Sequence, residues 1–144
     1  MNKHFLQHKI LLKLGYEPTF SQEKAILELA NFFDDVDNLC IFVLLGYAGT
    51  GKTYLISALI KFLDEIKLKV VLLAPTGRAA KVLTSYSEHN ASTIHKCIYR
   101  KKSTESINDN FVLNYNKYKD TVFIVDEASM IGNSDSANSI FGNG

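Results

Sequence analysis

Three runs of aliphatic and aromatic residues stand out along the chain, and polar residues do not alternate within them. The runs are Leu39–Leu45, Lys69–Ala74 and Thr121–Val125. Strands that are apolar on both faces are typical of parallel sheets that helices cover on each side. The pattern therefore predicts an α/β fold in which these runs are core strands of a mostly parallel sheet.

Between the runs, apolar residues recur at spacings of three and four, which is the period of an amphipathic helix. The set between the first two runs consists of Leu55, Ile56, Leu59, Ile60, Leu63 and Ile66. It predicts a strand–helix–strand unit. A helix is also expected from about Phe20 to Phe33, and Thr19 and Gln22 have the spacing of a capping box at its start.

Shorter elements follow the second run. Thr76 is placed to cap a short helix from Arg78 to Ser85, and another short helix is expected to begin near Ser92. The polar stretch from about Arg100 to Lys119 indicates a surface excursion, which we interpret as a hairpin that turns near Asn108 and Asp109.

Length and charge narrow the possible classes of protein. A chain of 144 residues is long enough to form one hydrophobic core. Its charge is nearly balanced, because 16 Lys and Arg residues face 15 Asp and Glu residues. We therefore expect a helical extension over residues 1–18, in which Ile10–Leu14 is a surface helix, and one domain over 19–144. The near balance of charge means that any contact with nucleic acid has to come from a local patch.

The cysteines and the apolar runs bear on where the chain functions. Cys40 and Cys97 are too few and too far apart for a disulfide framework, so we expect buried thiols in a reducing, cytoplasmic setting. The longest apolar runs fall far short of the roughly 20 residues that cross a bilayer, so no membrane span is expected. No structural metal is proposed, because His4, His8 and His89 lack partners at ligand-like spacing.

A glycine-rich motif stands between the first predicted strand and the helix after it. Residues 46–53, Gly-Tyr-Ala-Gly-Thr-Gly-Lys-Thr, fit the pattern G-x-x-x-x-G-K-[ST] in the strand-to-helix context that it requires. Such a loop turns its N–H groups toward phosphate oxygens, with Lys52 reaching the β and γ phosphates and Thr53 offering a hydroxyl to Mg²⁺. The alternative is a plain glycine-rich turn with an incidental lysine. The expected nucleotide-binding residues here are Gly46, Ala48, Gly49, Thr50, Gly51, Lys52 and Thr53.

An acidic pair follows the third run. Asp126 and Glu127 come directly after Val125, at the carboxyl end of a predicted parallel strand, which is the edge where ligands bind in such sheets. We expect Asp126 to hold Mg²⁺ through its water shell, and Glu127 to orient or deprotonate an attacking water. The alternative is a helix start with acidic residues in its first turn.

Four motifs in a fixed order identify a family resemblance. They are residues 46–53, Ala74–Lys81, Ser92–Lys96 and Val125–Met130. In this order they resemble the first motor domain of superfamily 1B DNA helicases of the RecD-like and Dda-like kind. The resemblance covers this chain from about Phe20 to Met130. The resemblance implies a RecA-like P-loop ATPase fold. It also implies that Gln22 reads the adenine of ATP and that Lys52, Asp126 and Glu127 serve in hydrolysis.

The same resemblance implies a track for single-stranded DNA. The residues that would approach the strand are Pro75, Thr76, Gly77, Arg78, Thr93 and His95. Each assignment has an alternative: Gln22 as a cap only, Arg78 as a solvated helix residue, and His95 as a structural hydrogen-bond donor. Tyr47 departs from the proline that is frequent at this place of the family's loop. The run Arg100–Lys102 is interpreted as a solvated loop, with contact to DNA as the alternative.

Taken together, the resemblance implies a motor domain that couples Mg-ATP hydrolysis to movement along single-stranded DNA, in DNA repair or recombination. Such a motor needs a second RecA-like domain that contributes an arginine to ATP hydrolysis, so this chain alone is expected to bind ATP but to be weakly active. We also expect the domain to be incomplete at its C-terminus and to leave an open sheet edge. The alternatives are a P-loop phosphotransferase and a non-catalytic nucleotide-dependent switch or DNA-binding module.

Overall fold

The structure is a computed structural model, and it describes residues 3–34, 40–101 and 111–132. They group into two compact units, each of which is described by itself below. Unit 1 lies within residues 1–71, 86–88 and 118–122. Unit 2 lies within residues 72–85, 89–117 and 123–144.

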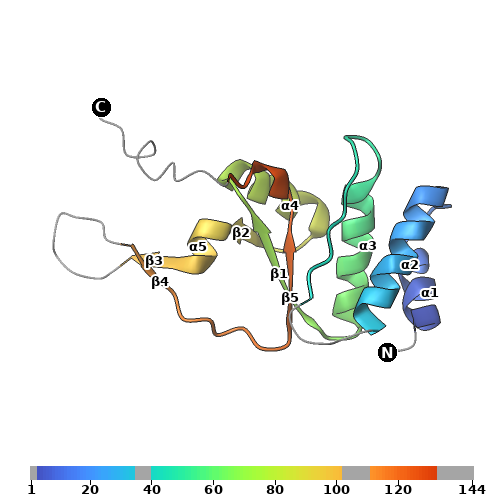
Figure 1. Cartoon of the computed structure of the whole chain (residues 1–144), viewed down its shortest axis with the longest axis horizontal. Helices are drawn as coiled ribbons and strands as arrows, with labels where there is room; N and C mark the ends of the chain where they lie inside the picture. The colour runs from blue at the N-terminus through green and yellow to red at the C-terminus, as the bar shows by residue number, and fades with distance from the viewer. Residues whose placement is uncertain (1–2, 35–39, 102–110, 133–144) are drawn as a thin grey trace. The chain divides into compact units, whose positions relative to one another are not determined.

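Unit 1 is built on three helices, shown in blue to green in Figure 1. They are α1 (Lys3–Leu14), α2 (Phe20–Asp34) and α3 (Lys52–Glu65). The two long helices that the periodicity predicted are confirmed, and α1 packs against both of them. The helix expected at Ile10–Leu14 exists as the end of α1, but its inner face is part of the core rather than surface. The fully or nearly fully buried residues of the three helices include Leu6, Ile10, Ile26, Leu55, Phe62 and Leu63.

An ion-pair cluster joins α1 to the end of α3. Glu65 accepts hydrogen bonds from Lys9 Nζ at 2.6 Å and is paired with Lys13 Nζ at 2.7 Å. These two ammonium groups lower the pKa of the Glu65 carboxyl from 4.5 to about 2, and the hydrogen bond from Lys13 is the largest cause. A lowered pKa in the folded state means that the stabilisation is fully present above pH 4.5 and is lost as the pH falls toward 2.

We therefore expect Glu65→Gln to destabilise the chain at pH 7 and to have progressively less effect as the pH is lowered from 4.5 to 2. The difference is small at any pH, because exposed ion pairs contribute little. Urea unfolding of both proteins at several pH values measures it. Glu17→Gln, which changes an exposed carboxylate outside this cluster, is the control. A difference that does not vary between pH 7 and pH 2 would contradict the assignment.

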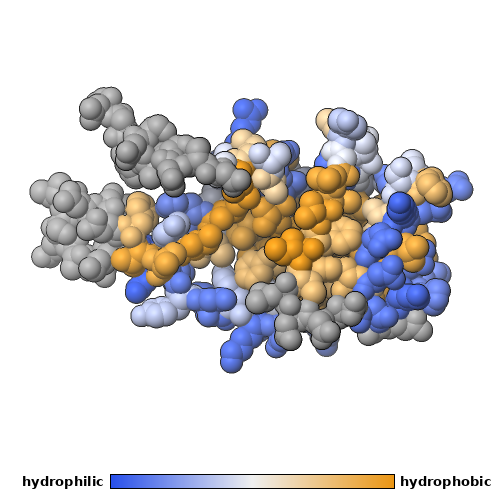
Figure 2. Space-filling view, in the orientation of Figure 1, coloured by the Kyte–Doolittle hydropathy of each residue, from blue (hydrophilic) through white to orange (hydrophobic). Residues whose placement is uncertain are grey.

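The predicted first strand is not a strand in the structure. Of the run Leu39–Leu45, residues 40–45 are described, and they belong to no helix or strand. Ile41, Val43 and Leu45 are 87%, 69% and 85% exposed, and the surface along this segment is hydrophobic in Figure 2. A strand requires a hydrogen-bonded neighbour, and none of the described strands pairs with this segment. The expected strand–helix–strand unit that began with this run is therefore wrong.

The sheet consists of three strands in the order β2-β1-β5. They are β1 (Lys69–Ala74), β2 (Ala91–Thr93) and β5 (Thr121–Val125). Two of the predicted core strands, β1 and β5, are confirmed. A parallel strand–helix–strand unit exists, but it is formed by β1, α4 (Gly77–Ser87) and β2. The architecture is α/β, with a parallel sheet flanked by helices, as a RecA-like P-loop fold requires.

Both short helices begin with a hydroxyl cap, of which the sequence suggested the one at Thr76. Ala79 N donates to Thr76 Oγ1 at 3.2 Å at the start of α4, and Lys96 N donates to Thr93 Oγ1 at 3.1 Å at the start of α5 (Ile94–Ile98). A side-chain oxygen in this position satisfies an N–H group that the first helical turn leaves without a partner. After β5, a 3-10 turn, η1, covers Ala128–Met130.

The expected hairpin is also present. Strand β3 (Tyr99–Lys101) pairs antiparallel with β4 (Phe111–Leu113), and Tyr99 lies opposite Leu113. The predicted turn at Asn108 and Asp109 lies outside the described residues. Within the described part of the chain, no helix is both long and apolar enough to cross a membrane.

The expected burial of the cysteines is wrong. Cys40 is exposed because it begins the segment without a strand partner, and Cys97 is half-buried on α5, a helix that buries none of its residues. Among the described residues, no three or more His, Cys, Asp or Glu side chains gather as a metal site would require.

Candidate functional site

The glycine-rich motif forms a turn that leads directly into α3. Gly49 and Gly51 have φ angles of +79° and +82°, in the left-handed region that favours glycine. Between them, Thr50 closes the turn, because its N–H and its hydroxyl both donate to Tyr47 O, at 3.4 and 2.8 Å. The glycine spacing that predicted a phosphate loop is thus required by the backbone of this turn.

Lys52 lies over the loop that precedes it. Its ammonium group donates hydrogen bonds to the carbonyl oxygens of Gly46 and Tyr47. Lys52 and Thr53 are also the first residues of α3, a helix of 14 residues whose N-terminal N–H groups and dipole favour an anion. A cation, loop amides and a helix N-terminus therefore gather at one place, which is the donor set that phosphate groups require.

Gln22 connects the start of α2 with this loop. Thr19 N donates to Gln22 Oε1 at 3.0 Å and Gln22 N donates to Thr19 Oγ1 at 3.4 Å, so the predicted capping box is confirmed. The Gln22 amide also donates to Thr50 O at 3.1 Å and to Tyr16 Oη at 3.2 Å. A Cβ atom at Gly51 would lie only 2.3 Å from Gln22 Nε2, so this position also needs glycine for space.

The hydrogen bonds of Gln22 bear on its expected role. In the structure both N–H groups of its side-chain amide have protein acceptors, and Gln22 is only 9% exposed. Reading of adenine by Gln22 stays a prediction, and it would require one of these bonds to be exchanged. The contact of Tyr16 with Gln22 was missed by sequence reasoning, because no motif includes a tyrosine six residues before the glutamine.

In unit 2, three predicted site segments follow the carboxyl ends of neighbouring strands. Ala74 of β1 lies opposite Thr93 of β2, and Asp126 N, just after β5, donates to Leu73 O at 3.0 Å. The segments that begin at Pro75, Ile94 and Asp126 therefore leave the same edge of the sheet. This edge is where parallel α/β sheets bind their ligands.

The acidic pair has a defined local geometry at this edge. Asp126 is half-buried, and its Oδ1 accepts a hydrogen bond from Glu127 N at 3.0 Å. Glu127 is exposed and has a φ angle of +54°, a left-handed conformation that costs a non-glycine residue about 1 kcal/mol or more. Strain of this kind concentrates at functional positions. The pair lies in unit 2 and the phosphate loop in unit 1, so their meeting stays a prediction.

The residues predicted to line a DNA track are positioned by helix starts. The hydroxyls of Thr76 and Thr93 are helix caps, while Gly77 and Arg78 are exposed in the first turn of α4. His95 is exposed on α5, and its ring lies 4.7 Å from the ring of Tyr99 and 5.1 Å from that of Phe111. These contacts give His95 a packing role, and the expected DNA contacts of this set stay predictions.

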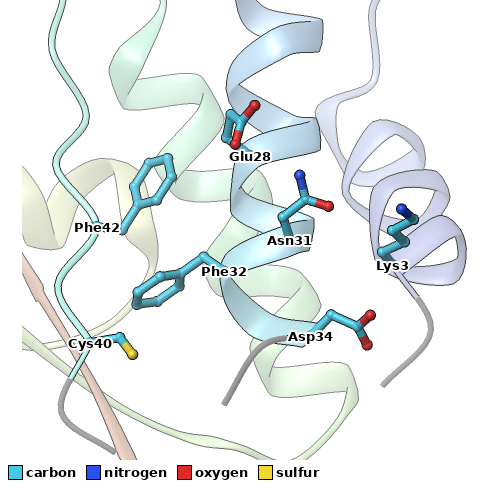
Figure 3. Close-up of a pocket in the computed structure, with 7 residues that line it drawn as sticks. All are labelled: Lys3, Glu28, Asn31, Phe32, Asp34, Cys40 and Phe42. Carbon is cyan, nitrogen blue, oxygen red and sulfur yellow. The ribbon is translucent and has the colours of Figure 1, made fainter. Parts of the chain in front are cut away.

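A pocket of about 670 Å³ in unit 1 contains none of the predicted site residues (Figure 3). Its lining residues are Lys3, Glu28, Asn31, Phe32, Asp34, Cys40 and Phe42. Phe32 and Phe42 meet edge to face at 5.6 Å. The carboxylates of Glu28 and Asp34 disfavour a phosphate there, so the pocket is no alternative to the glycine-rich loop.

Comparison with known proteins shows the family of the chain. A family model described as an AAA domain matches residues 21–140. The uncharacterized protein R530 of Acanthamoeba polyphaga mimivirus is 37% identical over 118 residues, which cover 63% of this chain and 23% of that protein. The ATP-dependent RecD2 DNA helicase of Deinococcus radiodurans is 35% identical over 71 residues, covering 49% of this chain and 10% of the helicase.

The multifunctional conjugation protein TraI of Escherichia coli K12 is 31% identical over 102 residues, covering 66% of this chain and 5% of TraI. The chain thus spans less than a quarter of the length of each of these relatives. The matched region contains all four motifs on which the resemblance to superfamily 1B helicases rests. The chain belongs to this AAA domain family, in agreement with the first RecA-like domain of a RecD-like helicase.

Proposed function

We propose that this chain is an ATP-binding and ATP-hydrolysing motor domain of a DNA helicase. The observation that carries the proposal is the loop of residues 46–53, in which left-handed glycines, a cation and the N-terminus of α3 gather. The names of two relatives, a RecD2 DNA helicase and a conjugation protein, support the choice of a motor that acts on DNA. The residues that would bind ATP are Gln22, Gly46, Ala48, Gly49, Thr50, Gly51, Lys52 and Thr53.

Each polar residue has a proposed role. Lys52 exchanges its bonds to Gly46 O and Tyr47 O for bonds to the β and γ phosphates, which as charged acceptors bind an ammonium group more strongly than carbonyls do. Thr53 and Asp126 would hold Mg²⁺, which takes oxygen ligands and would neutralise phosphate charge. Glu127 orients the attacking water and accepts its proton.

The coupling to DNA involves the sheet edge of unit 2. Residues Thr76–Arg78 offer backbone N–H groups, a hydroxyl and a guanidinium, which suit the phosphates of a strand that is bound without regard to sequence. A second RecA-like domain with an arginine is a required partner, because such an arginine accelerates hydrolysis by about 10³ to 10⁵. The chain alone is therefore expected to hydrolyse ATP slowly.

The proposal predicts that single-stranded DNA accelerates ATP hydrolysis by a protein that contains this chain and a second RecA-like domain. A phosphate-release assay with and without an unstructured oligonucleotide measures the effect. Acceleration by a small-molecule phosphate acceptor instead would favour a P-loop phosphotransferase. ATP binding without any hydrolysis would indicate a nucleotide-dependent switch. Either of these two results would contradict the proposal of a motor domain.

A further inference from the structure

Tyr16 lies in the short connection between α1 and α2, outside the motifs that the sequence identified. It follows Gly15, which ends α1 with a φ angle of +77°, a left-handed conformation typical of the residue after a helix. The Tyr16 ring meets the ring of Tyr54, in the first turn of α3, edge to face with 6.1 Å between the ring centres. Its hydroxyl oxygen lies 3.5 Å from the place that a Cβ atom at Gly51 would take. Tyr16 therefore borders both the glycine-rich loop and the start of α3.

Three protein groups hold the side-chain amide of Gln22 in one orientation. Its Oε1 accepts from Thr19 N at 3.0 Å, and its Nε2 donates to Thr50 O at 3.1 Å and to Tyr16 Oη at 3.2 Å. A flipped amide would place Nε2 against the N–H of Thr19 and Oε1 against the carbonyl of Thr50, and both contacts would be repulsive. Both N–H donors of Gln22 are thus used, whereas Oε1 can accept from a second donor. In order to donate to a base, Gln22 has to exchange one of its two protein acceptors.

The two acceptors of Gln22 differ in what their release costs. The carbonyl of Thr50 belongs to the backbone of the glycine-rich loop, so this bond ties Gln22 to the loop itself. The other acceptor is the hydroxyl of Tyr16, a side chain that is 42% exposed, so water can replace Gln22 as its partner. The bond to Tyr16 is therefore the one that a ligand exchanges at the lower cost. Gln22 is only 9% exposed, so its released N–H needs a new acceptor from that ligand.

We propose that Tyr16 is a positioning residue for the nucleobase, whose hydroxyl holds the Gln22 N–H that a purine ring nitrogen takes over when ATP binds. After the exchange, Gln22 stays bonded to Thr50 O, so the amide that reads the base remains attached to the phosphate loop. Adenine fits this amide, because its N7 accepts from Nε2 and its exocyclic amine donates to the second lone pair of Oε1.

Guanine fits the same amide less well. It carries an oxygen in place of the exocyclic amine, and this oxygen would face Oε1 of an amide that Thr19 and Thr50 hold in one orientation. The inference rests on the proposed function for the binding of ATP. It adds to that site a tyrosine that competes with the base for one hydrogen-bond donor.

The test measures the binding of ATP, GTP and inorganic tripolyphosphate, each with Mg²⁺, by isothermal titration calorimetry. Tripolyphosphate has no base, so it separates effects on the phosphate loop from effects on Gln22. Tyr16→Phe keeps the ring that packs against Tyr54 and removes only the competing hydroxyl. It should bind ATP about three- to tenfold more tightly than the unchanged chain, because that is the typical contribution of one hydrogen bond. Its affinity for tripolyphosphate should not change, and its gain for GTP should be smaller than for ATP.

Two further variants complete the test. In a chain that already carries Gln22→Ala, Tyr16→Phe should leave the affinity for ATP unchanged, because the competing bond no longer exists. Tyr115→Phe is the matched control, since it removes a hydroxyl from an exposed tyrosine of unit 2 that is not among the predicted nucleotide-binding residues.

The outcomes separate this inference from the proposed function. If Tyr16→Phe binds ATP no more tightly than the unchanged chain, or if GTP or tripolyphosphate shares the full gain, the exchange at Tyr16 is overturned while nucleotide binding stands. A gain that persists in the Gln22→Ala chain would also overturn the exchange, because the effect would then not pass through Gln22. Failure of the unchanged chain to bind ATP would overturn the proposed function and this inference together.

Discussion

Replacement of Lys52 by Ala is expected to weaken the binding of Mg-ATP by at least about tenfold, because a hydrogen bond to a charged group contributes roughly 1.5 to 3 kcal/mol. The ammonium of Lys52 lies over the loop, bonded to Gly46 O and Tyr47 O, so it is already at the place where phosphates would be held. Titration with a fluorescent ATP analogue measures the change.

A matched control is available on the same helix. Lys61 is exposed on α3 and touches no predicted site residue, so Lys61→Ala should leave the affinity for Mg-ATP unchanged. Lys52 also closes the loop through its two carbonyl contacts, so circular dichroism should show that the variant retains its helices. Equal affinity of the Lys52→Ala chain and the unchanged chain would remove Lys52 from the nucleotide site.

Glu127→Gln is expected to slow ATP hydrolysis by about 10² to 10⁴ while leaving the affinity for Mg-ATP within about twofold. Glutamine has the size of glutamate but cannot accept a proton from the attacking water. Glu127 is exposed, and no side-chain hydrogen bond of Glu127 caps η1, so its replacement has little structural effect. Release of radiolabelled phosphate over hours measures even the slow hydrolysis expected of the chain alone.

Glu88 offers a control with the same backbone conformation. It is an exposed glutamate with a φ angle of +61°, close to the +54° of Glu127, so Glu88→Gln reports any effect of the amide on a left-handed residue. Its rate should equal that of the unchanged chain. If Glu127→Gln hydrolyses ATP as fast as Glu88→Gln, Glu127 does not act as the base.

The helices and two of the core strands could be predicted because their signals are local. The spacing of Leu55, Leu59 and Leu63 defines one face of α3, and the hydroxyl of Thr76 marks the start of α4 within a few residues. Runs of β-branched residues located β1 and β5 for the same reason. Such signals lie within the segment itself and do not depend on its contacts with the rest of the chain.

The wrong prediction of the first strand concerns strand pairing, which depends on segments that are distant in the sequence. The run before the phosphate loop has the composition of a strand but has no described strand beside it, so Ile41, Val43 and Leu45 are exposed. In contrast, β2 consists of Ala91, Ser92 and Thr93, which carry no hydrophobic signal, and it is a strand because β1 lies next to it. A sequence pattern reports the preference of a segment and not the presence of its neighbour.

In the candidate site, too, local features could be predicted from the sequence, whereas contacts between distant segments could not. The motif predicted the turn at Gly49 and Gly51, since the glycine spacing follows from the backbone alone. The contacts that Gln22 makes with Thr50 and Tyr16 could not be predicted, because they depend on how the start of α2 packs against the loop.

The central claim is that residues 46–53 hold the phosphates of a nucleotide. Titration of a non-hydrolysable ATP analogue with Mg²⁺ into the isotope-labelled chain, followed through each backbone N–H signal by NMR, tests this most directly. The account predicts that the largest shifts occur at Gly49, Gly51 and Lys52, with smaller ones at Gln22, which is bonded to the loop. Shifts that avoid the loop, or that centre on the pocket beside Phe32 and Phe42, would contradict it.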